Sequence, residues 1–284
     1  MSQITKARYF EPLHDNHTKC LLCPHECEIP PGGEGNCGVR KNIGGELFAM
    51  SVGQVTSLAL DPIEKKPLRM FRPGSMILSV GSFGCNLSCA FCQNHTIAQP
   101  LGGLDTHYVP PEALAELATR TIPSGNIGVA FTYNEPLIGY EYVLESAKKL
   151  RDIDLKAILV TNGYLNPEPL FELLPFIDAI NIDLKGGDAF YKNLGGSLQP
   201  VMDTITNAAG KTHVEVTTLV ISGENEEDVE PIAEWLASVD PAIPLHLTCF
   251  HPRYQYADRS PTQRETTKRL AESARKYLMN VFEN

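Results

Sequence analysis

The 284-residue sequence contains no run of about 18 apolar residues, the length that a membrane-spanning helix needs. Residues 1–20 also lack the apolar stretch of a secretory signal peptide. An excess of basic residues is absent as well: 34 acidic and 24 basic side chains give a net charge of −10, which argues against a nucleic-acid backbone as the main partner. We therefore expect a cytoplasmic protein that acts on a small molecule or another protein, with no membrane and no nucleic acid as partner.

The cysteines are distributed very unevenly. The eight residues form two groups and one isolated position: Cys20, Cys23, Cys27 and Cys37; Cys85, Cys89 and Cys92; and Cys249. Spacings of two or three intervening residues are too tight for several disulfides to form without strain. In a reducing cytoplasm, grouped thiols more often bind metal or take part in chemistry. We therefore interpret both groups as metal ligands.

From Met76 onward, short apolar segments alternate with amphipathic ones. The segments typical of strands are 76–81, 127–133, 156–162, 179–185, 213–221 and 244–250. The segments typical of helices are 111–120, 139–152, 166–177, 199–209, 225–239 and 262–278. Repeated strand–helix units predict an α/β fold with an all-parallel sheet, whose chemistry lies at the carboxyl ends of the strands. The pattern itself fits a doubly wound open sheet and a partial barrel equally well.

Residues 1–75 differ in character from this core domain, 76–284. They are rich in glycine and proline around Cys37, which predicts a small loop-rich module that is too short to build a core without a metal. Residues 50–60 are expected to add one or two strands. The charged segment DPIEKKPL, residues 61–68, lies either over a substrate entrance or on a solvated face. Its charged residues are Asp61, Glu64, Lys65 and Lys66.

The second cysteine group lies in the segment FGCNLSCAFCQN, residues 83–94, just beyond the first predicted strand of the core domain. A structural zinc site or an ordinary four-iron cluster takes four protein ligands, and this loop supplies three. Three thiolates leave one coordination position open, which is what a catalytic metal needs. In the alternative interpretation, a distant residue such as Cys249 or a histidine closes a purely structural site.

The amino-terminal group has the spacing C-x2-C-x3-C-x9-C. Four potential ligands within eighteen residues fit either a closed structural zinc or a second iron–sulfur cluster that relays electrons or binds substrate. His25 is a further ligand candidate. Free reduced thiols are the remaining alternative.

The C-x3-C-x2-C spacing at the end of a first strand resembles the signature of the radical S-adenosylmethionine (SAM) superfamily. The resemblance implies a partial (β/α)6 TIM-like barrel and a [4Fe–4S] cluster held by Cys85, Cys89 and Cys92. It also implies that SAM binds the open iron and is cleaved reductively to methionine and a 5′-deoxyadenosyl radical. A non-catalytic iron–sulfur electron carrier or metal-binding protein is the alternative.

The same resemblance assigns cofactor contacts to residues at successive strand ends. Phe91 matches the position beside the adenine, Asn134 and Glu135 the motif that holds the SAM amino group, and Thr161 and Asn162 the ribose contacts. Asp183 and Lys185 follow the fourth strand, where a lysine neutralises the SAM carboxylate. His251 matches a SAM-proximal histidine of glycyl-radical activases. Cys249 and His251 are the candidates for a catalytic role, Cys249 as a hydrogen-atom donor or a metal ligand.

The whole chain resembles a narrower group, the radical SAM member of the AmmeMemoRadiSam system, which is similar to pyruvate-formate-lyase-activating enzyme. The segments that carry this resemblance include DPIEKKPL, RPGS, GCNLSCAFCQN, TYNEP and DLKG. The resemblance implies an electron donor such as flavodoxin or ferredoxin, and Memo-like and AMMECR1-like proteins or a glycyl-radical enzyme as partners. The segment TCFHPRY departs from the pattern expected there, which marks a distinct subgroup. Hydrogen abstraction from a glycyl-radical enzyme and from a small molecule both remain open.

Overall fold

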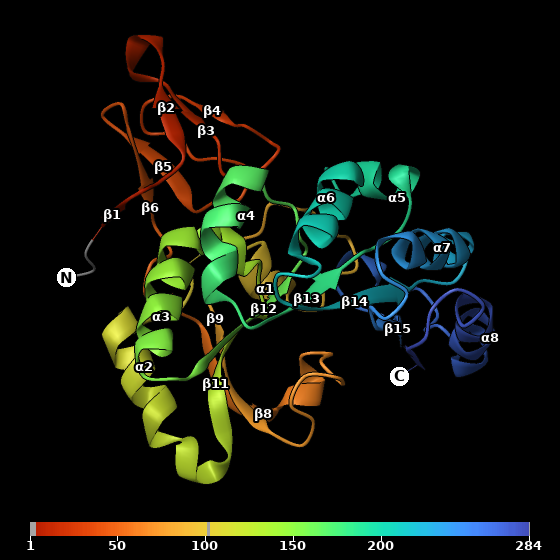
Figure 1. The fold of residues 1–284 in the computed structure, drawn as a ribbon. Helices are drawn as coiled ribbons and strands as arrows, with labels where there is room; N and C mark the ends of the chain where they lie inside the picture. The colour runs from red at the N-terminus through yellow and green to blue at the C-terminus, as the bar shows by residue number, and fades with distance from the viewer. Residues whose placement is uncertain (1–3, 101–102, 284) are drawn as a thin grey trace.

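The computed structural model describes residues 4–100 and 103–283. An eight-stranded sheet forms its centre, in the order β16-β15-β14-β13-β12-β11-β9-β8 (Figure 1). Its strands are β8 (Ser57–Pro62), β9 (Met76–Gly81), β11 (Asn126–Phe131), β12 (Lys156–Thr161), β13 (Ala179–Asp183), β14 (His213–Val220), β15 (Leu245–Cys249) and β16 (Val281–Glu283). All six strands predicted for the core domain are present within two residues of their expected bounds.

The prediction of an all-parallel sheet is wrong at one edge. Strand β8 pairs antiparallel with β9, with Leu58 opposite Val80 and Leu60 opposite Leu78. The connection between the two strands, residues 63–75, contains only the short 3-10 turn Ile63–Lys65, whereas a parallel pair needs a crossover that is usually helical. Strand β16 was not predicted, because three residues carry too little periodicity to stand out.

The helices follow the strands as expected. They are α1 (His95–Ala98), α2 (Pro111–Arg120), α3 (Tyr140–Asp152), α4 (Pro167–Leu173), α5 (Asp188–Asn193), α6 (Gln199–Ala208), α7 (Val229–Val239) and α8 (Arg264–Ala274). The short helices α1 and α5 were not predicted. Among the described residues, no helix combines the length and the apolar character that crossing a membrane requires.

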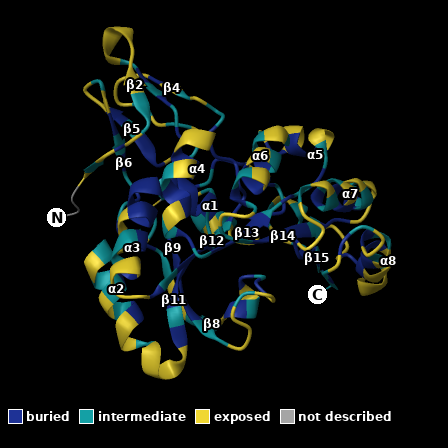
Figure 2. Ribbon diagram, in the orientation of Figure 1, coloured by how far each residue is buried: buried dark blue, intermediate teal, exposed yellow. Residues whose placement is uncertain are grey.

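The two faces of the sheet are covered differently, and this distinguishes a partial barrel from a doubly wound sheet. Helices α3 to α8 lie along one face, and the segment after β8 lies along the other (Figure 1). The second face carries its own small cluster of buried apolar residues. The strands of the sheet are largely buried (Figure 2). The cluster consists of Ile63, Leu68, Ile77, Ala130, Ile158 and Ala179. We call this second face the inner face, because helices surround the sheet on the other side only.

The segment 63–75 is fastened to the inner face by polar contacts. Asn181 Nδ2 on β13 donates to Pro67 O at 2.9 Å. Glu215 on β14, which is fully buried, accepts hydrogen bonds from the N–H groups of Arg69 at 3.0 Å and Met70 at 2.8 Å. His213 Nε2 and His246 Nε2 lie 2.8 and 2.6 Å from the same carboxylate. His213, at the start of β14, thus helps to hold the carboxylate that fastens the segment 63–75.

Glu215→Gln is expected to lower the free energy of unfolding by about 3 kcal/mol at pH 7, because it removes one partner from a buried charged network. Burial alone raises the pKa of Glu215, but hydrogen bonds from the two histidines and the two backbone N–H groups lower it to about 2. A carboxyl with a depressed pKa stabilises the fold above its unfolded pKa and loses that contribution as the pH falls toward the folded value. The difference between wild type and variant should therefore shrink between about pH 4.5 and pH 2.

Denaturant unfolding at several pH values measures this difference. Glu272→Gln is the matched control, because Glu272 on α8 is exposed and should change stability by less than about 0.5 kcal/mol. A Glu215→Gln variant as stable as this control would show that the network does not hold the segment.

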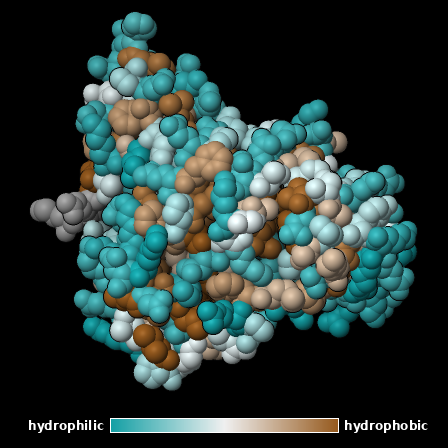
Figure 3. Space-filling view, in the orientation of Figure 1, coloured by the Kyte–Doolittle hydropathy of each residue, from teal (hydrophilic) through white to brown (hydrophobic). Residues whose placement is uncertain are grey.

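The amino-terminal module contains two three-stranded antiparallel sheets, β1-β6-β5 and β2-β3-β4. The strands are β1 (Thr5–Lys6), β2 (Phe10–Pro12), β3 (Thr18–Cys20), β4 (Glu28–Ile29), β5 (Arg40–Ile43) and β6 (Glu46–Ala49). A further pair joins β7 (Gln54–Val55) to β10 (His107–Tyr108). On the face drawn in Figure 3, hydrophobic side chains form small groups between hydrophilic ones. The module packs on the core domain through a buried ion pair between Arg40 Nη1 and Glu141 Oε1, at 2.8 Å.

Candidate active site

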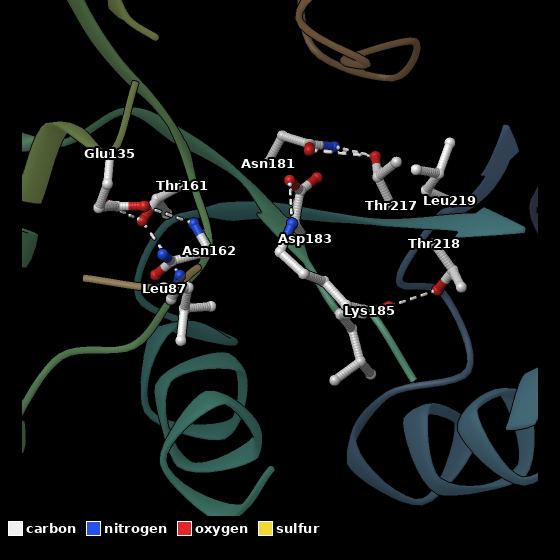
Figure 4. Close-up of polar contacts among 12 residues, drawn as sticks. Leu87, Glu135, Thr161, Asn162, Asn181, Asp183, Lys185, Thr217, Thr218 and Leu219 are labelled. Atoms are coloured by element: carbon white, nitrogen blue, oxygen red, sulfur yellow. Dashed lines mark hydrogen bonds and ion pairs between the residues drawn. The ribbon is translucent and has the colours of Figure 1, made fainter. Parts of the chain in front are cut away.

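The carboxyl ends of β9, β11, β12 and β13 bring most of the predicted cofactor residues to one edge of the sheet. Figure 4 shows Glu135, Thr161 and Asn162 together, with Asp183 and Lys185 on the neighbouring strand end. The cysteine loop follows β9 at the same edge. Parallel strands place their carboxyl ends side by side, so the expected convergence of these sequence segments follows from the topology.

The three thiols of the cysteine loop lie in a poorly hydrated environment. Burial raises the pKa of all three, that of Cys89 to about 11, while the charge of Lys185 acts in the opposite direction. A buried thiolate needs a positive partner, which a bound metal supplies. Within residues 4–100 and 103–283, no group of three or more Cys, His, Asp or Glu side chains is arranged to hold a metal ion. Metal loading would therefore draw the sulfurs together, which the irregular backbone from Cys85 to Cys92 permits.

Asn134 holds the entrance of the cysteine loop. Its Oδ1 accepts from Ser82 N at 2.9 Å, and its Nδ2 donates to the carbonyls of Phe83 at 3.1 Å and Gly84 at 3.2 Å. The side chain predicted to contact SAM therefore shapes the loop that carries the thiols.

Glu135 joins the ends of β11 and β12. Its Oε1 accepts from Thr161 Oγ1 at 2.7 Å and Leu137 N at 2.9 Å, and its Oε2 accepts from Asn162 N at 2.7 Å. Burial raises the pKa of Glu135 to about 7, against these hydrogen bonds. A carboxylate has about four acceptor positions, so Oε2 keeps one that an amino group of a ligand can use.

Asn162 links the hydrogen bonds of Glu135 to a thiol. Its Nδ2 lies 3.7 Å from Cys85 Sγ and 2.9 Å from Asn86 Oδ1. Asn86 in turn donates to Tyr164 O at 2.8 Å. The sequence analysis did not single out Asn86, because its partners lie far away in the chain and only its position beside Cys85 hinted at a role.

Lys185 carries a positive charge that acts to lower the pKa of all three thiols in the cysteine loop. Its Nζ lies 2.9 Å from Asp183 Oδ2. Burial alone lowers the pKa of Lys185, but Asp183 and Cys89 raise it above its usual value, so the ammonium stays charged. The backbone beside it is fixed by Thr218 Oγ1, which donates to Leu184 O at 2.8 Å (Figure 4). A permanent positive charge at this strand end suits the carboxylate of a ligand.

Phe91 is buried beneath the segment that follows β15. Its ring stacks on Phe190 with centroids 5.8 Å apart, and it also contacts Tyr256 at 6.0 Å. Gln255 N donates to Ala90 O at 3.0 Å, and the Tyr254 ring stacks on His95 at 4.5 Å. Residues 254–256 therefore cover the cysteine loop.

Of the two residues predicted as catalytic candidates, Cys249 has its side-chain contact on the helix side of the sheet. Cys249 Sγ lies 3.6 Å from Thr267 Oγ1 of α8, and its neighbours Leu245 and Leu247 are fully buried in the main core, which the helices share. Since alternate residues of a strand face opposite sides, Cys249 faces the helices rather than the inner face. His251 is exposed in the loop beyond β15.

Within the charged segment 61–68, Lys65 is exposed, whereas Lys66 is turned toward the inner face. Lys66 is 3% exposed, and its Nζ lies 2.9 Å from Asp61 Oδ2. The same carboxylate oxygen accepts from Ser79 Oγ at 3.0 Å and Tyr133 OH at 2.9 Å. These four residues form a polar group on the inner face, which we call the lumen cluster.

Two of the amino-terminal cysteines, Cys20 and Cys37, lie in the electrostatic range of the buried Arg40. Cys20 and Cys23 are buried, and burial raises the pKa of Cys23 to about 12. Burial also raises the pKa of Cys20 and Cys37, while the charge of Arg40 lowers it. Thiols near a buried cation are a setting in which the thiolate form, the form that binds metal, is favoured.

The model of the radical SAM superfamily matches residues 79–236, and the chain belongs to that superfamily. It is therefore an enzyme of the radical SAM type, whose family cofactors are a [4Fe–4S] cluster and SAM. The three thiols of the cysteine loop, the charge of Lys185 that acts on them and the free acceptor position on Glu135 fit these groups. Cys85, Cys89 and Cys92 would hold the cluster, and Glu135 and Lys185 would face the amino and carboxylate groups of SAM.

The chain is also similar to individual proteins. The chain is 39% identical over 268 residues to the uncharacterized protein MJ0808 of Methanocaldococcus jannaschii, and the match covers 92% of this chain and 79% of that protein. It is 38% identical over 61 residues to the 4-hydroxyphenylacetate decarboxylase activating enzyme of Clostridium scatologenes, a match to 22% of this chain and 20% of that enzyme. The structure of Streptococcus suis SuiB bound to S-adenosylmethionine has the same fold over 70% of this chain and 47% of SuiB, with a TM-score of 0.56 at 13% identity.

Proposed function

We propose that the protein cleaves SAM reductively and uses the resulting 5′-deoxyadenosyl radical to abstract a hydrogen atom from a small polar substrate bound on the inner face. When bound, the cluster and SAM supply the radical. The residues of the chain orient SAM through Glu135 and Lys185 and keep the thiols dry. The lumen cluster is the observation that favours a small polar substrate.

The lumen cluster has the features of a binding group rather than of simple packing. Tyr133 adopts a φ of 74°, a left-handed conformation that is strained for a bulky side chain. Its ring lies so close to Gly81 that a Cβ on this glycine would be 2.8 Å from Tyr133 Cδ2. The Lys66 ammonium lies over the same ring, 4.8 Å from its centroid. The strained backbone at Tyr133 thus places its phenol against the ion pair of Lys66 and Asp61, close to the carboxyl end of β11.

Activation of a glycyl-radical enzyme is the second branch of the proposal, and the match to an activating enzyme supports it. Within either branch we propose a flavodoxin- or ferredoxin-type electron donor, Memo-like and AMMECR1-like partner proteins of the AmmeMemoRadiSam system, and a cytoplasmic location. We also propose a second metal, zinc or an iron–sulfur cluster, at Cys20, Cys23, Cys27 and Cys37.

Anaerobic reconstitution followed by addition of SAM and dithionite tests the central proposal. Formation of 5′-deoxyadenosine is the expected result. A protein with a fully loaded cluster that forms none would be a non-catalytic iron–sulfur carrier instead.

Transfer of deuterium from an extract of deuterated cells to 5′-deoxyadenosine distinguishes a small-molecule substrate from a glycyl-radical enzyme. The small-molecule fraction of such a cell extract should yield deuterated 5′-deoxyadenosine, and Lys66→Met should reduce this yield at least tenfold, because it removes the buried ammonium that lies 2.9 Å from Asp61 Oδ2 and over the Tyr133 ring. SAM cleavage without substrate should change little in the variant. Deuterium that arrives only from the macromolecular fraction would favour the glycyl-radical branch.

A further inference from the structure

The amino-terminal module rests directly on the catalytic cysteine loop. His25 Nε2 lies 2.6 Å from the carbonyl oxygen of Asn86. On the other side of Cys85, a Cβ on Gly84 would lie 2.5 Å from the carbonyl oxygen of Cys37, and Gly84 has a φ of +83°. Only glycine permits this approach without displacing the backbone. The residues before and after Cys85 are therefore both in contact with the amino-terminal cysteine segment.

Asn86 lies between the two cysteine groups. It follows Cys85 directly, and its carbonyl oxygen is the partner of His25 Nε2, which stands between Cys23 and Cys27 in the chain. The Asn86 side chain also acts to lower the pKa of the Cys23 thiol, which burial raises. A parallel contact runs from Asn86 Oδ1 through Asn162 Nδ2 to Cys85 Sγ, over 2.9 and 3.7 Å.

Arg40 is a separate sign that the amino-terminal thiols hold a negatively charged group. The side chain is 1% exposed, and its Nη1 and Nε are bonded to Glu141 Oε1 and Ile138 O. Its Nη2 is buried without a hydrogen-bond partner. The electrostatic partners of Arg40 besides Glu141 are Cys20 and Cys37. A buried N–H without a partner is costly, and thiolates or inorganic sulfides would satisfy it.

A structural zinc would explain the four thiols and the arginine, but not the path to Cys85. Nothing in a closed zinc site requires its ligands to be joined to a catalytic loop by hydrogen bonds. A redox centre at the same place would gain from that path, because hydrogen bonds to cluster sulfurs and their surroundings set its potential.

We propose that Cys20, Cys23, Cys27 and Cys37 hold a redox-active iron–sulfur cluster that passes electrons to the catalytic cluster through Asn86. A protein donor of the flavodoxin class reduces the amino-terminal cluster by one electron. That cluster is reoxidised as the catalytic cluster gains the electron, which is then consumed in cleaving SAM. The inference rests on the proposed SAM cleavage, and Asn86 acts in it as a positioning residue.

The test compares two reductants on the reconstituted full-length protein. Dithionite reaches both clusters, whereas a reduced flavodoxin delivers electrons through the amino-terminal one. We expect about eight iron atoms per chain and two cluster signals in electron paramagnetic resonance spectra, and about four iron atoms with one signal in Cys23→Ala. The ratio of flavodoxin-driven to dithionite-driven reduction of the catalytic cluster should fall at least tenfold in Cys23→Ala and in Asn86→Ala, measured by freeze-quench spectroscopy.

Cys249→Ala is the control for this ratio, since Cys249 faces α8. Zinc in place of the second cluster would overturn the inference, and so would an unchanged ratio in both variants. A wild-type protein with two clusters and normal transfer between them that still forms no 5′-deoxyadenosine would instead contradict the proposed function. The two failures are therefore distinguishable.

Discussion

Replacing Cys89 with alanine is expected to remove the catalytic cluster and to reduce the formation of 5′-deoxyadenosine to background. The three thiols belong to one loop that follows one strand, and the charge of Lys185 acts to lower the pKa of each of them. Two thiolates cannot replace three, because a four-iron cluster would then have two open irons instead of one. Iron content, visible absorption and product formation after anaerobic reconstitution measure the effect.

Cys249→Ala is the matched control for this experiment as well. It removes one thiol of the same chain, but one that lies 3.6 Å from Thr267 Oγ1 on the helix side of β15. The catalytic cluster and SAM cleavage should therefore be retained. A Cys89→Ala protein that keeps its cluster signal would show that another residue closes the site, and loss of activity in Cys249→Ala would restore the predicted role of that residue.

The sequence was sufficient to locate the strands and the edge where the chemistry lies. Parallel strands that are buried on both faces are apolar almost throughout, so their bounds stand out against amphipathic helices. Polar residues directly after such strands, among them Glu135, Asn162 and Lys185, must then meet at one edge. That is why the order of motifs along the chain predicted a spatial cluster.

The sequence could not predict which face of a strand a given residue lies on, or which residues distant in the chain contact each other. Cys249 stands at a strand end like the other candidates, but the alternation of β15 turns it toward α8. The charges of segment 61–68 left a substrate entrance and a solvated face open, and they did not record that Lys66 is buried against Asp61 on the inner face. The choice between a partial barrel and a doubly wound sheet likewise depended on this segment, which takes the place that helices would occupy.

The link between the two cysteine groups shows the same limit. His25 and Asn86 are 61 positions apart, and no local pattern records that the imidazole reaches the Asn86 carbonyl. The spacing of the amino-terminal cysteines predicts a metal whatever its purpose, and it leaves a structural zinc and an electron-relaying cluster open. Only the fold places that cysteine segment beside the loop that carries Cys85, which favours a route for electrons.

Lys185→Met is expected to weaken SAM binding by about tenfold to a hundredfold without loss of iron, because a charge-assisted hydrogen bond contributes about 1.5–3 kcal/mol. The side chain is 14% exposed at the carboxyl end of β13, and its charge is maintained by Asp183 and Cys89. Methionine keeps the length and the apolar stem but removes the charge. Equilibrium binding of SAM to the reconstituted protein measures the change, and cluster absorption shows whether the metal site is intact.

Two variants separate an effect on SAM from a general loss of charge. Lys192→Met removes an exposed lysine from the neighbouring helix α5 and should leave SAM affinity unchanged. Asp183→Asn removes the carboxylate that lies 2.9 Å from Lys185 Nζ and frees the ammonium for the ligand, so SAM affinity should be kept or increased. If Asp183→Asn instead weakens binding as strongly as Lys185→Met, then the ion pair acts by holding the strand end in place, and the SAM carboxylate finds its counter-charge elsewhere.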